Sequence, residues 1–91
     1  MKGGENMDTS VKKVGVVTHY YNKIGVGIIK CEEEIKTGDK LRFEGHETKF
    51  DQDIKELQFD HKMIETAKKG QEVGIKLDQR VRENDLVYKI G

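Results

Sequence analysis

The sequence predicts an all-β fold, a small closed barrel of about six strands, and three observations point to it. A chain of 91 residues has room for one compact core. Apolar, mostly β-branched residues alternate with polar residues or glycine in short runs, which is the period of a strand. Turn signals separate the runs at intervals of about 8–12 residues, as in sandwiches and barrels. Closure is favoured over a sandwich because it removes exposed strand edges.

The first half of the chain contains three such runs. In Val14–Thr18 the even-numbered residues are expected to share one face of a strand. Ile24–Lys30 begins by alternating β-branched residues with glycine, and the bare glycine face suits a strand that another backbone crosses closely. A turn at Ile35–Lys40, with Gly38 free to take positive φ, leads into the alternating strand Leu41–Gly45.

The middle of the chain is open to two interpretations. Apolar residues change parity within Glu47–Phe59, which predicts a strand with a β-bulge near Lys55 or Glu56. The same apolar residues also match helical spacing, so a helix over Asp51–Phe59 is the alternative. Met63–Lys69 is compatible with a single helical turn, too short to be an independent helix.

The last third predicts two further strands. Val73–Leu77 alternates cleanly, and Leu86–Ile90 does so again at the end of the chain. Between them, Val81–Asn84 is expected to turn, since asparagine tolerates the left-handed conformation. Residues 1–10 are polar with two glycines and are expected to form a flexible tail, so the predicted domain covers residues 11–91.

Composition limits the classes of function. Lysine plus arginine and aspartate plus glutamate each number 17, so the net charge of zero argues against a general grip on nucleic-acid backbone. Cys31 is the only cysteine, which excludes an intramolecular disulfide and favours a reducing compartment. Neither a signal-peptide core nor an apolar run of about 20 residues occurs. A soluble cytoplasmic protein is expected, with no contact to membranes or DNA.

Three segments in order resemble the second domain of elongation factor Tu and its relatives. They are Gly25–Ile29, the turn and strand Ile35–Phe43, and Ala67–Ile75 with its "glycine, polar pair, valine, glycine" pattern. The final segment, Glu83–Tyr88, resembles the last strand of that family, although the family has glycine where Asn84 stands. The resemblance implies a Greek-key-type barrel, a stand-alone elongation-factor-like domain without the GTPase domain.

The GTPase chemistry of that family is missing from this sequence. No GxxxxGK[ST] loop is present, and Asn22–Gly25 lacks the acid that reads guanine. The resemblance therefore implies a non-catalytic module of protein biosynthesis that binds RNA or a ribosomal component through its loops. The alternative is an accessory barrel that docks on a protein supplied in trans, such as a GTPase or another enzyme.

An aromatic loop and two basic clusters are the predicted contact residues. Adjacent tyrosines in a strand point to opposite faces, so at least one ring is exposed and free to stack or anchor. Basic residues in turns could form a local positive patch despite the zero net charge. The candidates are His19, Tyr20, Tyr21, Lys23, Lys68, Lys69, Arg80 and Arg82.

Catalytic and metal sites are not predicted. The histidines His19, His46 and His61 have no close spacing of the kind that zinc ligands favour, with or without Cys31. Asp60 beside His61 suggests a general base, but no nucleophile stands near it in the sequence. Metal-assisted hydrolysis through His19 or His61 is thus the weakest hypothesis, and no cofactor is expected.

Overall fold

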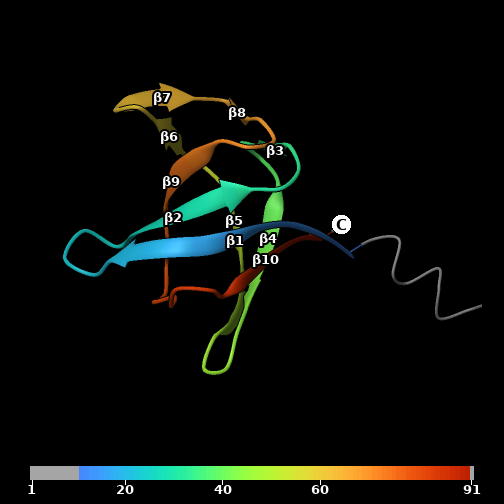
Figure 1. Ribbon diagram of the computed structural model, residues 1–91, viewed down its shortest axis with the longest axis vertical. Helices are drawn as coiled ribbons and strands as arrows, with labels where there is room; N and C mark the ends of the chain where they lie inside the picture. The colour runs from blue at the N-terminus through green and yellow to red at the C-terminus, as the bar shows by residue number, and fades with distance from the viewer. Residues whose placement is uncertain (1–10, 91) are drawn as a thin grey trace, which may run out of the picture.

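The computed structural model describes residues 11–90, in which every regular element is a strand (Figure 1). The ten strands are β1 (Val11–Tyr21), β2 (Val26–Cys31), β3 (Ile35–Lys36), β4 (Lys40–Glu44), β5 (Lys49–Asp53), β6 (Leu57–Phe59), β7 (Lys62–Ile64), β8 (Thr66–Ala67), β9 (Glu72–Lys76) and β10 (Leu86–Ile90). The all-β prediction is confirmed. The predicted tail, residues 1–10, lies outside the described residues. Over residues 11–90 no helix has the length and apolarity needed to cross a bilayer.

Eight strands form one antiparallel sheet in the order β5-β4-β10-β1-β2-β9-β6-β7, while β3 pairs separately with β8. The long strand β1 lies in the middle, between β10 and β2, so the first and last strands are neighbours and Val11 lies opposite Ile90. The predicted closed six-stranded Greek-key barrel is wrong. Among the described strands the ladder is open, with β5 at one edge and β7 at the other.

A buried side chain connects β5 to the far part of the sheet. Gln52 of β5 donates from Nε2 to the carbonyl of Lys76 at the end of β9 (2.9 Å), and its Oε1 accepts from the Asp78 amide (2.8 Å). These two bonds satisfy backbone groups that a further ladder would otherwise pair. A side chain, not a strand ladder, thus links β5 to the end of β9 in this open sheet.

The pairing register shifts twice along β1, once before Gly15 and once after Val17. Each shift inserts a residue and reverses the inward–outward alternation. Val14 and Val17 are therefore both buried, although they differ by three positions. The prediction that the even-numbered residues of Val14–Thr18 share one face is wrong for this reason.

The parity change in the middle of the chain marks a break between two strands. Ile54 and Leu57 are both buried, and the three residues 54–56 connect β5 to β6. The predicted bulge at Lys55 or Glu56 is replaced by this connection. The alternative helix over Asp51–Phe59 is wrong, because β5 pairs with β4 and β6 pairs with both β7 and β9.

The predicted helical turn Met63–Lys69 is also wrong, since these residues supply β7 and β8. The chain reverses onto β6 through Asp60 and His61, which both have positive φ (55° and 65°), as a two-residue type I′ hairpin requires. Other turn predictions are confirmed. Gly38 has φ 95° and Asn84 has φ 76°, so both adopt the conformations that their residue types permit.

Sixteen buried apolar residues form the core on the inner face of the sheet. Gly27 of β2 faces inward, and a Cβ there would lie only 2.7 Å from Cδ1 of Leu77. The space beside this glycine is thus filled by a side chain of the β9–β10 loop. The sequence alone predicts that another backbone fills it. As a consequence, the neighbouring Val26 and Ile28 point to the outer face, where both are partly exposed.

Candidate functional site

The structure divides the predicted contact residues between the two ends of β2. The β1–β2 turn carries one group, and the β9–β10 loop approaches it with two arginines. Lys68 and Lys69 lie at the opposite end, because Gly70 next to them donates its amide to the carbonyl of Cys31 (2.8 Å). A six-residue strand spans roughly 17–20 Å, so the two lysines do not join the other group. The group at the turn comprises His19, Tyr20, Tyr21, Lys23, Arg80 and Arg82.

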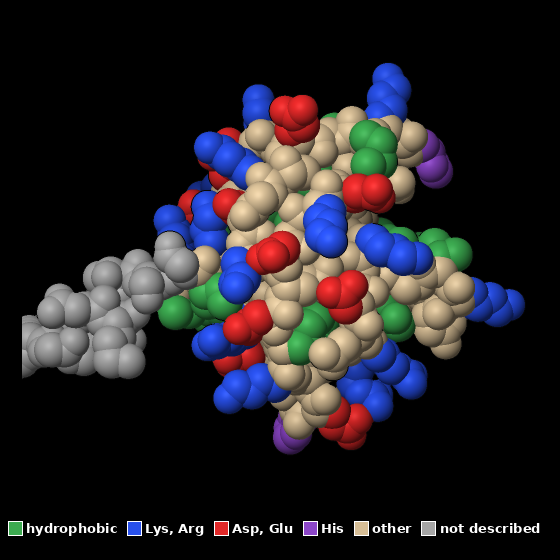
Figure 2. All heavy atoms as spheres, turned by 180° about the vertical axis from the view of Figure 1, so that it is seen from behind, with side chains coloured by type: hydrophobic (Ala, Val, Ile, Leu, Met, Phe, Trp, Pro, Cys, Tyr) green, Lys and Arg blue, Asp and Glu red, His purple; other side chains and the backbone are tan. Residues whose placement is uncertain are grey.

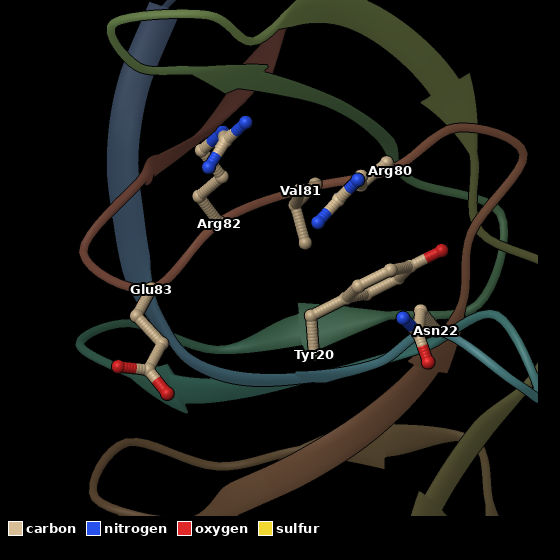
Figure 3. A pocket seen from close by; sticks show the side chains of 6 residues that line it. All are labelled: Tyr20, Asn22, Arg80, Val81, Arg82 and Glu83. Carbon is tan, nitrogen blue, oxygen red and sulfur yellow. The ribbon is translucent and has the colours of Figure 1, made fainter.

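Part of this group surrounds a hollow of about 340 Å³, the arginine hollow, shown in Figure 3. The side chains of Arg80 and Asn22 lie near the ring of Tyr20, whereas Glu83 points away from it. Tyr20 also packs against the core and is only partly exposed. The lining residues are Tyr20, Asn22, Arg80, Val81, Arg82 and Glu83.

A buried carboxylate fixes the loop that presents the arginines. Oδ2 of Asp85 accepts from the amide of Arg82 (2.9 Å), and the Asp85 carbonyl accepts from the amide of Val17 in β1 (2.9 Å). The amide of Asn84 donates a hydrogen bond to the Val17 carbonyl (2.7 Å). Gly45 faces the Asp85 carboxylate so closely that a Cβ would have no room. The loop is therefore held by β1 and by the β4–β5 turn.

Within residues 11–90, one of the two arginines of the hollow has an ion pair and the other has none. Arg82 Nη2 pairs with Oε1 of Glu47 (2.6 Å), and Nδ1 of His19 lies 3.4 Å from Oε2 of Glu83. Arg80 has no acidic partner within residues 11–90. A single guanidinium beside a phenol ring can hold a carboxylate or another oxyanion. The geometry gives the hollow this capacity.

Tyr21 points to the other face of the sheet, as predicted for adjacent tyrosines, and leads to a second hollow that sequence reasoning missed. This outer groove, of about 380 Å³, lies between the β1–β2 hairpin and the β6–β7 hairpin. Figure 2 shows hydrophobic side chains on the flank of an indentation between these two projecting hairpins. The lining residues are Tyr21, Ile24, Val26, Ile28, Gln58, Asp60, His61, Glu72 and Gly74.

A missing side chain forms the floor of the outer groove. Gly74 of β9 lies opposite Ile28 of β2 and opposite Gln58 of β6 in the sheet register. All three residues face outward, so the glycine leaves a depression between the neighbouring side chains. The sequence alternates glycine with apolar residues at Ile24–Ile28, but this pattern alone does not say which face is buried. It indicates an apolar outer groove only when the structure shows that Gly27 faces the core.

The rim of the outer groove is polar and contains two carboxylates, Asp60 and Glu72, beside Gln58 and His61. Neither Asp60 nor Glu72 has a basic partner within 4 Å in the part of the chain that the structure describes. Lys76 instead donates from Nζ to the carbonyl of Ile24 (2.6 Å), which ties the β1–β2 turn to β9. Lys76 and Glu56 line an adjoining hollow of about 260 Å³ that shares Ile24 with the groove.

The titratable residues considered for chemistry are dispersed. His19, His46 and His61 belong to three different hairpins, and residues 11–90 contain no group of three or more His, Cys, Asp or Glu side chains placed to hold a metal ion. Cys31 is buried, and this desolvation raises the pKa of its thiol to about 11, against a lowering by the nearby charge of Lys30.

Comparison with known proteins identifies what the chain is similar to. No family model matches it. It is 39% identical over 77 residues to the "uncharacterized protease MJ0090" of Methanocaldococcus jannaschii, covering 84% of this chain and 19% of that protein. It is 30% identical over 78 residues to a protein of Porphyromonas gingivalis named collagenase, covering 84% and 22%. This chain thus spans about a fifth of the length of either relative.

A solved structure shares the fold. It is the C-terminal domain of a protein from Geobacillus thermoleovorans assigned to the U32 peptidases, with a TM-score of 0.83 at 20% identity over 88% of this chain and 93% of that one. These matches contradict the resemblance to elongation factor Tu and the role in protein biosynthesis and RNA binding that it implied. The quoted segments, Ile35–Phe43 and Ala67–Ile75, consist of glycine-bearing turns and alternating strands, which unrelated β-domains share.

Proposed function

We propose that this chain is an accessory domain of the U32 peptidase type, which docks on a separate catalytic part and performs no catalysis itself. One observation carries the proposal. The relative MJ0090 matches this chain at 39% identity over a segment that makes up 19% of the protease. A domain of the same fold has been solved as the C-terminal unit of a protein assigned to the same class. The accessory alternative of the sequence analysis is therefore retained, and the translation reading is not.

The chemistry of the described residues supports a non-catalytic role. Cys31 is a poor nucleophile near neutral pH, because its buried thiol has a raised pKa and the thiolate is the reactive form. The hydroxyl of Thr18 donates to the carbonyl of Ile28 (3.2 Å), so a backbone group and not a base accepts its proton. The two hollows instead offer an arginine and an apolar surface, which are features of recognition.

A trans-complementation experiment tests the proposal. The matching 77-residue segment is deleted from MJ0090, and this chain is added to the truncated protein. We expect the chain to bind the truncated protein, measured by isothermal titration calorimetry, and to bind intact MJ0090 much more weakly because its own segment occupies the site. Equal absence of binding to both proteins contradicts the proposal. So does peptidase activity of the isolated chain on denatured casein.

A further inference from the structure

We infer that the outer groove is the docking surface of this domain, and that it receives an extended polypeptide segment carrying apolar side chains flanked by lysine or arginine. This inference rests on the proposed function, since the segment would belong to the catalytic part. Three independent features of the groove support it: its apolar lining, its shape and the charge of its rim.

The lining is apolar where an outer sheet face is ordinarily polar. Val26 and Ile28 follow the outward positions of β2, and Tyr21 and Ile24 continue the patch into the hairpin turn. The exposed fraction is 48% for Tyr21 and 57% for Ile24, among the highest of the large hydrophobic residues in the described chain. Contiguous exposed apolar surface of this kind is typical of sites that another molecule covers.

The shape suits an extended chain. The floor at Gly74 is flanked by Ile28 on one side and Gln58 on the other, in register across three antiparallel strands. The groove continues past Val26 into the adjoining hollow. A partner strand presents side chains to one face at every second residue, about 6.5–7 Å apart, which matches the spacing between Val26 and Ile28 on β2.

The rim selects the charge of the occupant. Asp60, Glu72 and, at the adjoining hollow, Glu56 stand beside the apolar lining with no ion pair within 4 Å in residues 11–90. Two lysines lie near them: Lys30 is opposite Glu72 in the sheet register, and Lys76 shares the adjoining hollow with its Nζ bonded to the carbonyl of Ile24. An acidic rim around an apolar floor fits a segment that is apolar and basic.

The occupant is assigned to the catalytic part because of the length of chain that relatives possess beyond this domain. This chain spans 19% of MJ0090, so four fifths of that protein lies outside the matched segment and is available to cover the groove. Single exposed apolar residues need no partner, whereas a contiguous apolar groove with carboxylates at its edge offers a surface on which such a partner can dock.

Three variants of the 91-residue chain test the inference against two matched controls. Gly74→Val fills the floor with a residue that strands favour, Ile24→Ser removes exposed apolar surface, and Glu72→Gln removes one rim charge. The controls, Val11→Ser and Glu34→Gln, alter an exposed apolar residue and an exposed carboxylate outside the groove. Binding to truncated MJ0090 is measured by calorimetry, and circular dichroism checks that each variant is folded.

We expect Gly74→Val and Ile24→Ser to weaken binding about tenfold or more, and both controls to bind like the parent. Glu72→Gln should weaken binding about threefold at low salt, with the difference disappearing at high salt. If the parent binds and the groove variants bind equally well, the inference is overturned while the proposed function stands.

If the parent does not bind truncated MJ0090, the proposed function fails and a second measurement decides on the groove alone. A short peptide in which valine and lysine alternate is titrated into the isotope-labelled chain. We expect shifts of the amide resonances of Val26, Ile28 and Gly74 in the nuclear magnetic resonance spectrum. A peptide with glutamate in place of lysine should produce none. Absence of shifts with the lysine peptide, or equal shifts with both, overturns the inference.

Discussion

An added methyl group should distinguish an inner glycine of the sheet from an outer one. A Cβ at Gly15 in β1 would lie 2.7 Å from the carbonyl oxygen of Lys30 and 2.8 Å from Cγ2 of Ile29. That carbonyl belongs to β2, which pairs with β1 at this point, so it cannot retreat without disturbing the ladder. At Gly74 the nearest atom is Cγ1 of Val26 at 3.3 Å, on a partly exposed side chain that can yield.

The magnitudes separate the two positions. Overpacking costs typically about 1–3 kcal/mol, and a backbone neighbour places Gly15→Ala at the upper end, near ~3 kcal/mol. Replacing glycine in a strand returns about 0.5–1 kcal/mol of conformational entropy in both variants. Gly15→Ala should therefore lose about 2 kcal/mol of unfolding free energy, or roughly 8–16 °C in Tm for a domain of this size. Gly74→Ala should be unchanged or gain about 0.5 kcal/mol.

Urea unfolding followed by circular dichroism measures both changes against the parent, provided that the transitions are two-state with equal slopes. The reasoning is refuted if Gly15→Ala unfolds within about 0.5 kcal/mol of the parent, or if Gly74→Ala loses as much as Gly15→Ala. Either result would mean that the inward and outward faces of the sheet are assigned incorrectly, and the outer groove with them.

Three further outcomes are expected. Gln52→Ala should cost about 2 kcal/mol, because the Lys76 carbonyl and the Asp78 amide lose their partner, and hydrogen exchange at Asp78 should accelerate. Burial raises the pKa of Cys31 from 9.0 to about 11, so stability held by the neutral thiol is complete below pH 9.0 and is lost as the pH rises towards 11. Over that pH range the free energy of chemical unfolding should fall more for the parent than for Cys31→Ala. His61→Gly relieves a φ of 65°, worth about 1–2 kcal/mol, against about 0.5–1 kcal/mol of entropy that glycine loses on folding. The urea midpoint should therefore rise slightly, and a clear fall would show that the turn is not strained.

Strands that bury one regular face could be predicted from the sequence. Val73–Leu77 and Leu41–Gly45 alternate without interruption, and their inward residues are buried as expected. Val14–Thr18 could not be assigned in the same way. Its faces depend on two bulges, which arise from pairing with β10 on one side and β2 on the other. Local alternation contains no information about those partners.

The candidate sites depended even more on distant contacts. Tyr20 meets Arg80 and Arg82 only because the Asp85 loop folds back on β1, so the sequence named these residues without showing that they share one hollow. The outer groove needed the order β2-β9-β6, which brings Gly74 beside the β1–β2 hairpin. The alternation of apolar residues with glycine at Ile24–Ile28 does not say which face is buried, and the outward orientation of Val26 and Ile28 is evident only in the sheet.

The pairing of the first and last strands has a mechanical consequence. Val11 and Ile90 are direct neighbours across an antiparallel ladder, with Cα atoms roughly 4.5–5.5 Å apart. A pull applied at these two points loads the β1–β10 rungs one after another, as in a zipper, instead of shearing them all together. The domain should therefore yield at low force when stretched between these two residues. A larger chain attached at only one of these two residues would not apply this load to the β1–β10 ladder, and the sheet would stay folded while the chain is stretched.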